Sequence, residues 1–164
     1  MCSSDLRWLA DLGGTLLTTG ARRLQPVAGG WQVETDEGRR LQAPQVVVAL
    51  GPWSRGFLLR QLGIGLPMGF ERGGHRHFQP GPGPALQRPV HDGAGGYVLA
   101  PMAMGLRLST GVHLGPRAAP LPPAMLDAAE QAARSALALG PRTDAPDWQG
   151  ARPTLPDSRP MIGA

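Results

Sequence analysis

The chain has 164 residues, a formal net charge of +4 and one cysteine, so it can form neither an internal disulfide nor a cysteine-rich metal framework. All sixteen basic residues are arginines, scattered without the one-sided basic stripe that nucleic-acid binding requires, which excludes that class of partner. No segment is long and apolar enough to span a bilayer. The N-terminus also lacks the basic and apolar pattern of a secretory signal.

The first six residues differ in character from the rest. Met-Cys-Ser-Ser-Asp-Leu resembles the translation of a sequencing-adapter end, so we expect residues 1–6 to be a non-native leader and leave them out of the fold argument. The alternative is that Ser3 or Ser4 caps the next helix. Residues 6–12 predict the end of a helix, with the glycine pair at 13–14 as its left-handed cap.

Short strand patterns follow. Residues 16–17 suggest a short buried strand, and segments 22–27 and 31–35 predict the two strands of a hairpin. The Ala-Gly-Gly segment at 28–30 suits the tight turn between them, because such turns need positive φ.

The next segment reads as strand, turn and helix. Another turn is expected at 36–38, and the continuous apolar run 46–50 predicts a strand covered on both faces. Apolar residues from Phe57 to Leu62 have a helical period that ends at Gly63. By pattern, residues 13–63 belong to an α/β nucleotide-binding domain.

A second region, residues 66–162, is mostly extended. Glycines at 93–96 predict a hairpin turn, and segment 106–114 alternates like a strand. One face of that strand is expected to carry Leu106, Leu108, Thr110, Val112 and Leu114. An alanine-rich helix is expected over 123–139, lying flat on a sheet and ended by Gly140.

The C-terminal residues contain the most specific motif. Trp148-Gln-Gly-Ala-Arg152-Pro153 is followed by Pro-Asp-Ser-Arg-Pro-Met-Ile-Gly at 156–163. An arginine held beside an aromatic residue and a proline presents a rigid fork of donors that suits a carboxylate. The passage resembles the substrate-side signature of the FAD-dependent amino-acid oxidoreductases, the superfamily of D-amino-acid oxidase, glycine oxidase and D-amino-acid dehydrogenase.

The resemblance implies a fold and a division of the chain. The fold class is mixed α/β and α+β: the tail of a Rossmann-like FAD-binding domain plus a mostly antiparallel substrate domain. Residues 7–64 would end a first cofactor-domain segment, 65–151 would form the substrate (cap) domain, and 152–164 would return to the cofactor domain. The sequence has no G-x-G-x-x-G loop, so we expect an internal fragment, truncated at both ends and inactive alone.

The resemblance also implies site residues. Arg152 would bind the substrate carboxylate, with Tyr97 and His75 as further substrate-binding residues. The turn Gly51-Pro52-Trp53 would lie near FAD, because glycine lets the backbone approach a ligand closely. Two alternatives stay open: Arg152 as an exposed arginine that caps the Asp157 turn, and Tyr97 as ordinary sheet packing.

The implied function is oxidation of an amino or imino acid by hydride transfer from Cα to flavin N5, of the D-amino-acid dehydrogenase or oxidase type, in amino-acid catabolism. Electrons would pass to oxygen or to a quinone. We expect a bacterial protein in the cytoplasm or at the periphery of the inner membrane, with no transmembrane segment. Two other classes compete: a β-rich domain that binds small carboxylates without flavin, and a metal-binding protein through His75 and His77.

Overall fold

The computed structural model describes residues 3–163, and side chains from Leu6 onward. The chain forms two compact units. The first contains the residues up to Ala49 together with Ser54–Gly65, and the second contains Leu50–Trp53 and the residues from Leu66 onward. Their assignment as cofactor and substrate domains stays a prediction.

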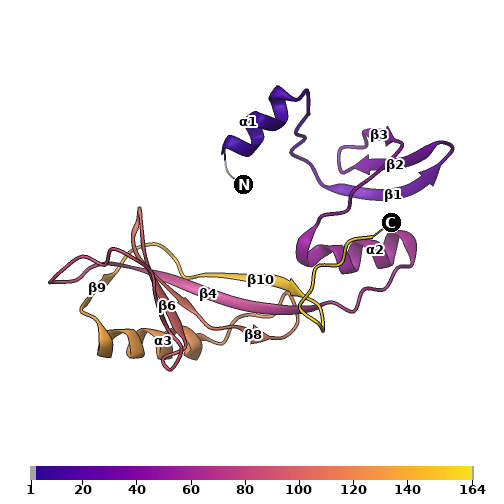
Figure 1. Cartoon of the computed structure of the whole chain (residues 1–164). Helices are drawn as coiled ribbons and strands as arrows, with labels where there is room; N and C mark the ends of the chain where they lie inside the picture. Colours follow the sequence, from indigo (N-terminus) through magenta and orange to yellow (C-terminus); the bar gives the residue numbers. More distant parts are fainter. Residues whose placement is uncertain (1–2, 164) are drawn as a thin grey trace. The chain divides into compact units, whose positions relative to one another are not determined.

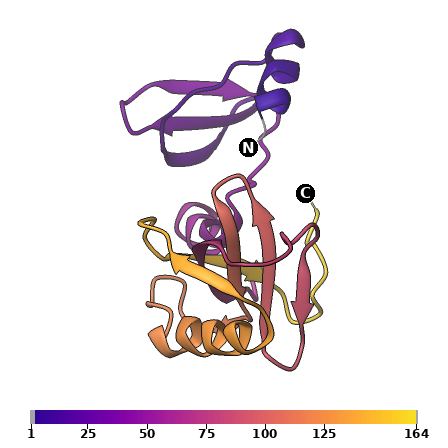
Figure 2. The same ribbon diagram turned by 90° about the vertical axis from the view of Figure 1, so that its left-hand side faces the viewer.

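The first unit is a small antiparallel sheet with two helices. Its elements are α1 (Ser3–Asp11), β1 (Ala21–Val27), β2 (Gly30–Thr35), β3 (Arg40–Ala43) and α2 (Ser54–Leu62). The strands pair in the order β1-β2-β3 (Figure 2). The predicted hairpin is confirmed, with Gly29 at φ 80° in its turn. The predicted turn at 36–38 is also confirmed, and Gly38 at its end has φ 81°. Strand β3 is short and exposed, and no strand was predicted there from the sequence.

The two helices of this unit end beside the glycines that were predicted to end them. Helix α1 is followed by Gly13 at φ 77°, and α2 by Gly63 at φ 70°, a conformation that costs glycine little. Helix α2 is tied to β1 because the Leu24 backbone N–H donates to Gln61 Oε1 at 3.1 Å. The predicted leader includes residues 1–2, which lie outside the described part, and the capping alternative depends on side chains that also lie outside it.

Two strand predictions in this unit are wrong. Residues 46–50 form no strand, and the Val47 side chain is 88% exposed. Residues 16–17 are also outside any strand, with Leu16 exposed. An apolar run becomes a covered strand only when neighbouring strands complete its hydrogen-bond ladder, and no strand of residues 3–163 pairs with either segment.

Among its described residues, the second unit contains an antiparallel sheet of seven strands and one α-helix. Its elements are the 3-10 turn η1 (Gly51–Trp53), β4 (Gly69–Pro80), β5 (Val90–Asp92), β6 (Tyr97–Met102), β7 (Gly105–Thr110), β8 (His113–Leu114), α3 (Pro123–Ala136), β9 (Leu139–Arg142) and β10 (Trp148–Thr154). The antiparallel order is β10-β4-β7-β6-β5, and β8 and β9 also pair with β4. The long strand β4 is therefore the organising element (Figure 1). No helix of the described residues is long and apolar enough to cross a membrane.

The predicted strand at 106–114 is interrupted. Strand β7 stops at Thr110, Gly111 donates its N–H to Gly96 at 2.9 Å, and β8 resumes at His113. The register against β4 shifts by one residue between the two pairings. Such a bulge reverses the alternation of side chains, so Leu114 lies on the opposite face from Leu108, against expectation.

Helix α3 ends three residues earlier than expected. Leu137 is already extended, at φ −140°, and Gly140, expected to stop the helix, lies inside β9. Arg134 stabilises this exit, because its Nε and Nη groups bond Glu130 and the carbonyls of Leu139 and Gly140. The shorter helix leaves Leu139 to begin β9, which pairs with β4.

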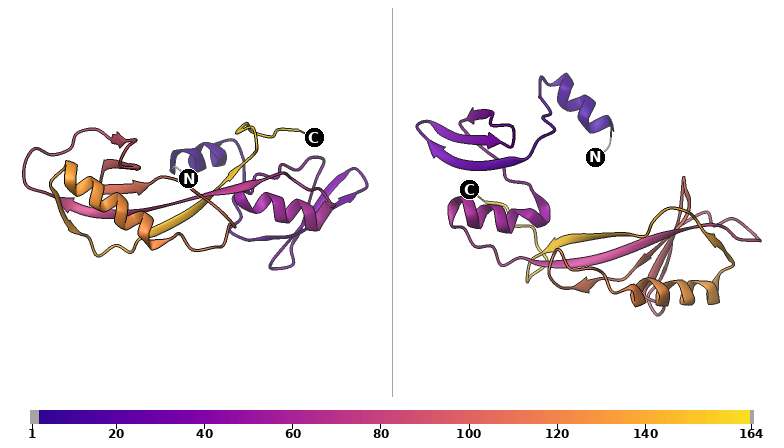
Figure 3. Two further views of the ribbon diagram at one scale, coloured as in Figure 1. Left: turned by 90° about the horizontal axis from the view of Figure 1, so that it is seen from below. Right: turned by 180° about the vertical axis from the view of Figure 1, so that it is seen from behind.

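The core of the second unit lies between α3 and one face of the sheet. It consists of Phe78, Tyr97, Leu99, Leu108, Ala129, Ala133 and Leu139. Figures 1 and 3 show α3, in orange, running along one side of the sheet. The alanine-rich helix therefore lies flat on the strands, as the sequence predicts, and the described residues of the second unit form no other α-helix that could cover the opposite face.

Candidate functional site

The helix-free face of the large sheet gathers the chemistry-bearing side chains. Strand alternation and register assign the face, with Arg152 opposite Glu71, Trp148 opposite His75, and Arg107 opposite His77. We call this set the open-face row; its members are Glu71, His75, His77, Arg107, Trp148 and Arg152. The predicted carboxylate-binding arginine and the predicted His75 thus lie on one surface.

Arg152 is exposed yet oriented. Its Nε donates to Glu71 Oε2 at 3.1 Å, and its Nη2 donates to the same oxygen. The Arg152 side chain is 73% exposed, and its Nη1 has no hydrogen bond to the described residues. Asp157 instead accepts the backbone N–H of Arg159 at 3.1 Å, so Arg152 does not cap that turn. Donors of Arg152 stay free for an external carboxylate.

Trp148 lies between Arg152 and the histidines, and the absence of a side chain at Gly150 gives its indole the space to do so. Its indole stacks on the His75 imidazole, with centroids 4.8 Å apart and planes 19° apart. A Cβ placed on Gly150 would lie 2.1 Å from Trp148 Cη2. Glycine at the middle of the W-x-G-x-R motif therefore leaves room for the indole to lie along the strand.

The two histidines lie edge to face, with ring centroids 5.1 Å apart. Burial lowers the pKa of His75, and the neighbouring His77 and Arg107 lower it further, whereas Asp147 opposes them. The lowered pKa favours the neutral form of His75. The described residues hold no group of three or more His, Cys, Asp or Glu side chains that could bind a metal ion.

Arg107 is a further member of the row, and the sequence predicted no role for it. Its Nε is buried without a hydrogen-bond partner, and it repels a proton on His75. Alternation in 106–114 already assigned Arg107 to the face opposite Leu108, so strand periodicity was the available signal.

We expect the Arg107→Gln variant to raise the pKa of His75, because the substitution removes a positive charge and keeps a side chain of similar size. Titration of the His75 ring proton signals by NMR would measure the change. The Arg159→Gln variant, which removes an exposed charge elsewhere, should leave that pKa in place. An unchanged His75 titration in the Arg107 variant would remove the proposed coupling.

Tyr97 is not brought together with Arg152. It is 2% exposed and belongs to the core beneath α3, on the opposite face of the sheet. Strands β4 and β7 also separate its strand from β10. Burial and the nearby Asp92 raise the pKa of the Tyr97 hydroxyl. This arrangement agrees with the sheet-packing alternative, and a substrate-binding Tyr97 would require a different packing of β6.

The turn Gly51-Pro52-Trp53 forms η1. Gly51 has φ 53°, and no atom lies within 4 Å of where its Cβ would be. Trp53 is exposed, and the Arg117 guanidinium lies 5.1 Å from its ring centroid. An open backbone beside an exposed indole fits one contact with a flavin nucleotide, whereas a glycine-rich phosphate loop is absent from the sequence. The turn is a candidate contact, not a complete cofactor site.

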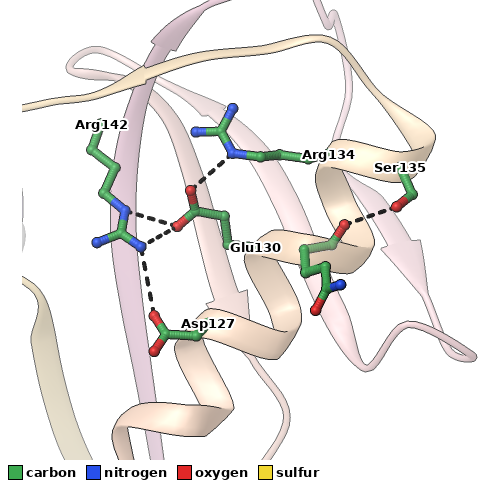
Figure 4. A pocket seen from close by; sticks show the side chains of 6 residues that line it. Asp127, Glu130, Arg134, Ser135 and Arg142 are labelled. Atoms are coloured by element: carbon green, nitrogen blue, oxygen red, sulfur yellow. Dashed lines mark hydrogen bonds and ion pairs between the residues drawn. The ribbon is translucent and has the colours of Figure 1, made fainter.

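A second group of charged residues lies on the α3 side (Figure 4). It lines an open cavity of about 440 Å³ formed by Asp127, Glu130, Gln131, Arg134, Ser135 and Arg142. Glu130 lies 2.8 Å from both Arg142 and the buried Arg76 of β4, and Arg76 pairs with Asp147 at 2.7 Å. The carboxylates and arginines of this cavity pair with one another and with Arg76, so they anchor α3 to β4 and β9 and leave no unpaired carboxylate for a ligand.

The comparisons with known proteins agree on the fold. Residues 2–164 match the family model DAO, FAD dependent oxidoreductase. No curated protein sequence matches. Iminodiacetate oxidase from Chelativorans sp. BNC1 is similar at TM-score 0.74 and 21% identity, over 98% of this chain and 44% of that one.

Two further structures resemble the chain. For glycine oxidase from Geobacillus kaustophilus the TM-score is 0.68 at 21% identity, over 94% of this chain and 41% of that one. For L-amino acid deaminase from Proteus vulgaris, with its specific insertion deleted, it is 0.64 at 26% identity, over 95% and 40%. The chain thus spans less than half the length of each. With a matching family model over nearly its whole length and the same mixed α/β fold, the chain belongs to the DAO family of FAD-dependent oxidoreductases.

Proposed function

We propose that this chain carries the substrate-binding sheet of an enzyme that oxidises an amino or imino acid with FAD. The observation that carries the proposal is the Arg152 guanidinium. It is exposed on the helix-free face, held by Glu71 through two of its nitrogens, and has free donors beside an indole. The similar structures include an iminodiacetate oxidase and an L-amino acid deaminase, and these names support a substrate that carries both a carboxylate and a nitrogen.

Residues of the open-face row have different roles in the proposed substrate site. Arg152 binds the carboxylate, and Glu71 restricts the rotation of Arg152, so less rotamer freedom is lost when substrate binds. Trp148 covers one side of the bound molecule and excludes water from it. Because its lowered pKa favours the neutral form, His75 adds no further positive charge beside a substrate amine. FAD, when bound, supplies the acceptor for the hydride.

Finer features of this function are also proposals. We propose the D-amino-acid dehydrogenase type of the reaction, acting in amino-acid catabolism, with oxygen or a quinone as the final acceptor. The location would be the cytoplasm or the inner-membrane periphery. Because the sequence holds no phosphate-binding loop, we propose that the 164-residue chain does not turn over by itself.

The test uses the longest open reading frame that contains this chain. The purified product should be yellow, and its flavin absorbance near 450 nm should bleach under anaerobic addition of one of a panel of D-amino acids, glycine and imino acids. A colourless product that binds small carboxylates by calorimetry would support the flavin-free alternative instead. A flavoprotein that no amino or imino acid reduces would show that the substrate class is wrong.

A further inference from the structure

We propose that a second cavity, on the α3 side of the β4–β10 pair, binds a phosphate group. The cavity has a volume of about 240 Å³ and lies wholly within the second unit. Its walls are Pro52, Trp53, Arg72, Arg117, Ala118, Ala119, Gln149, Gly150 and Ala151. Two arginines and no acidic residue line it. Arg72 and Arg152 point to opposite faces of the sheet, so this site is separate from the carboxylate site proposed above.

Arg72 is the first reason for the assignment. The residue is 4% exposed, and its side chain bonds only uncharged groups. Nη1 donates to the carbonyl of Pro120 at 2.6 Å and to that of Ala119, and Nη2 contacts His113 Nδ1. Its Nε is buried without a hydrogen-bond partner. A buried guanidinium without a counter-charge is costly, and an anion in the adjoining cavity would remove that cost.

Arg72 forms part of the cavity wall, and the residues around it leave room for its guanidinium. A Cβ on Gly115 would come within 3.1 to 3.5 Å of the Arg72 guanidinium, so glycine at that position leaves the group its room. The side-chain oxygen of Gln149 does not take the place of an anion beside Arg72, because that oxygen accepts the Leu121 backbone N–H at 2.7 Å. The positive charge of Arg72 therefore has no counter-charge among the described residues.

Arg117 supplies the second positive charge. It is exposed, it forms no ion pair with the described residues, and its guanidinium lies over Trp53. Two guanidinium groups without a carboxylate suit a dianion better than a single carboxylate. A phosphate group carries about −1.5 to −2 charges at pH 7 and three strong acceptor oxygens. The Trp53 ring could also contact a ring attached to that phosphate.

The ligand chemistry is shared by two sources, free inorganic phosphate and the phosphate of a flavin nucleotide. The first measurement is therefore a calorimetric or ³¹P NMR titration of the 164-residue chain with inorganic phosphate at low ionic strength. We expect saturable binding that weakens roughly tenfold or more in the Arg117→Ala variant, since a charge-assisted bond is lost. The Arg88→Ala variant removes an exposed arginine outside the cavity and should bind phosphate as the parent chain does.

A matched pair at Ala118 tests the charge of the site directly, without touching the buried Arg72. Ala118 is exposed at the cavity wall, so either substitution should leave the fold intact. The Ala118→Glu variant places an internal carboxylate beside the two arginines and should abolish phosphate binding. The Ala118→Gln variant has the same size without the charge and should retain most of it.

FMN and riboflavin separate the two sources. Arg117-dependent binding of FMN, much tighter than that of phosphate and absent for riboflavin, would assign the site to a flavin nucleotide. Equal affinities for phosphate and FMN would assign it to a free anion. The proposal is overturned if none of these phosphates binds saturably, or if the Ala118→Glu and Arg117→Ala variants bind them as tightly as the parent. The flavin-bleaching test of the proposed function can fail or succeed without changing this result.

Discussion

The Arg152→Lys variant of the flavin-containing enzyme is expected to lose roughly 100-fold in kcat/KM for its amino-acid substrate, with most of the loss in KM. Arg152 presents a planar fork whose Nη1 is free while Glu71 holds Nε and Nη2. Lysine keeps the charge but cannot bond Glu71 and a carboxylate in that fixed geometry. Steady-state kinetics with the substrate found by flavin bleaching would measure the loss.

Two further variants serve as comparisons for the Arg152→Lys enzyme. Arg159→Lys changes another exposed arginine of the C-terminal segment and should leave kcat/KM unaltered. Glu71→Gln keeps a hydrogen-bond acceptor but removes the ion pair, so we expect a smaller loss than for Arg152→Lys. If the Arg152→Lys enzyme has the parent values of both KM and kcat/KM, Arg152 does not bind the substrate.

The Glu130→Gln variant is expected to lower the free energy of unfolding at pH 7 by about 3 kcal/mol. Burial alone would raise the pKa of Glu130. Hydrogen bonds from Arg142, Arg76 and Arg134 outweigh burial and bring that pKa down to about 2 from its ordinary 4.5. The substitution leaves buried Arg76 with one carboxylate fewer beneath α3. Urea denaturation monitored by circular dichroism would measure the change.

The pH dependence of unfolding checks the same network. Because the pKa of Glu130 is lower in the folded than in the unfolded chain, its stabilisation is complete above the ordinary value of 4.5 and is lost as the pH falls toward 2. The Glu130→Gln variant should lack that component of the acid loss. Asp144→Asn is the control, since Asp144 is exposed and forms no ion pair with the described residues. Equal acid sensitivity of the parent and the Glu130 variant would argue against the network.

Local features of this protein could be predicted from its sequence. The hairpin with Gly29 in its turn, the ends of the helices at Gly13 and Gly63, and the start of α3 at Pro123 all follow from conformational preferences of a few neighbouring residues. The W-x-G-x-R motif likewise predicted an arginine available to a carboxylate. Its residues lie two apart on one strand, so alternation alone places Trp148, Gly150 and Arg152 on the same face.

Partners distant in the sequence decided the rest. The run at 46–50 has the composition of a covered strand, yet burial depends on neighbouring strands that a local pattern does not contain. The one-residue bulge after Thr110 reversed the face of Leu114, and the strand order separated Tyr97 from Arg152. Arg72 and Arg76 look alike in the sequence, four residues apart on β4. Only the tertiary structure gives Arg76 carboxylates at positions 127, 130 and 147 and leaves Arg72 with carbonyl groups and a cavity, because charge pairing across elements depends on packing and not on spacing along the chain.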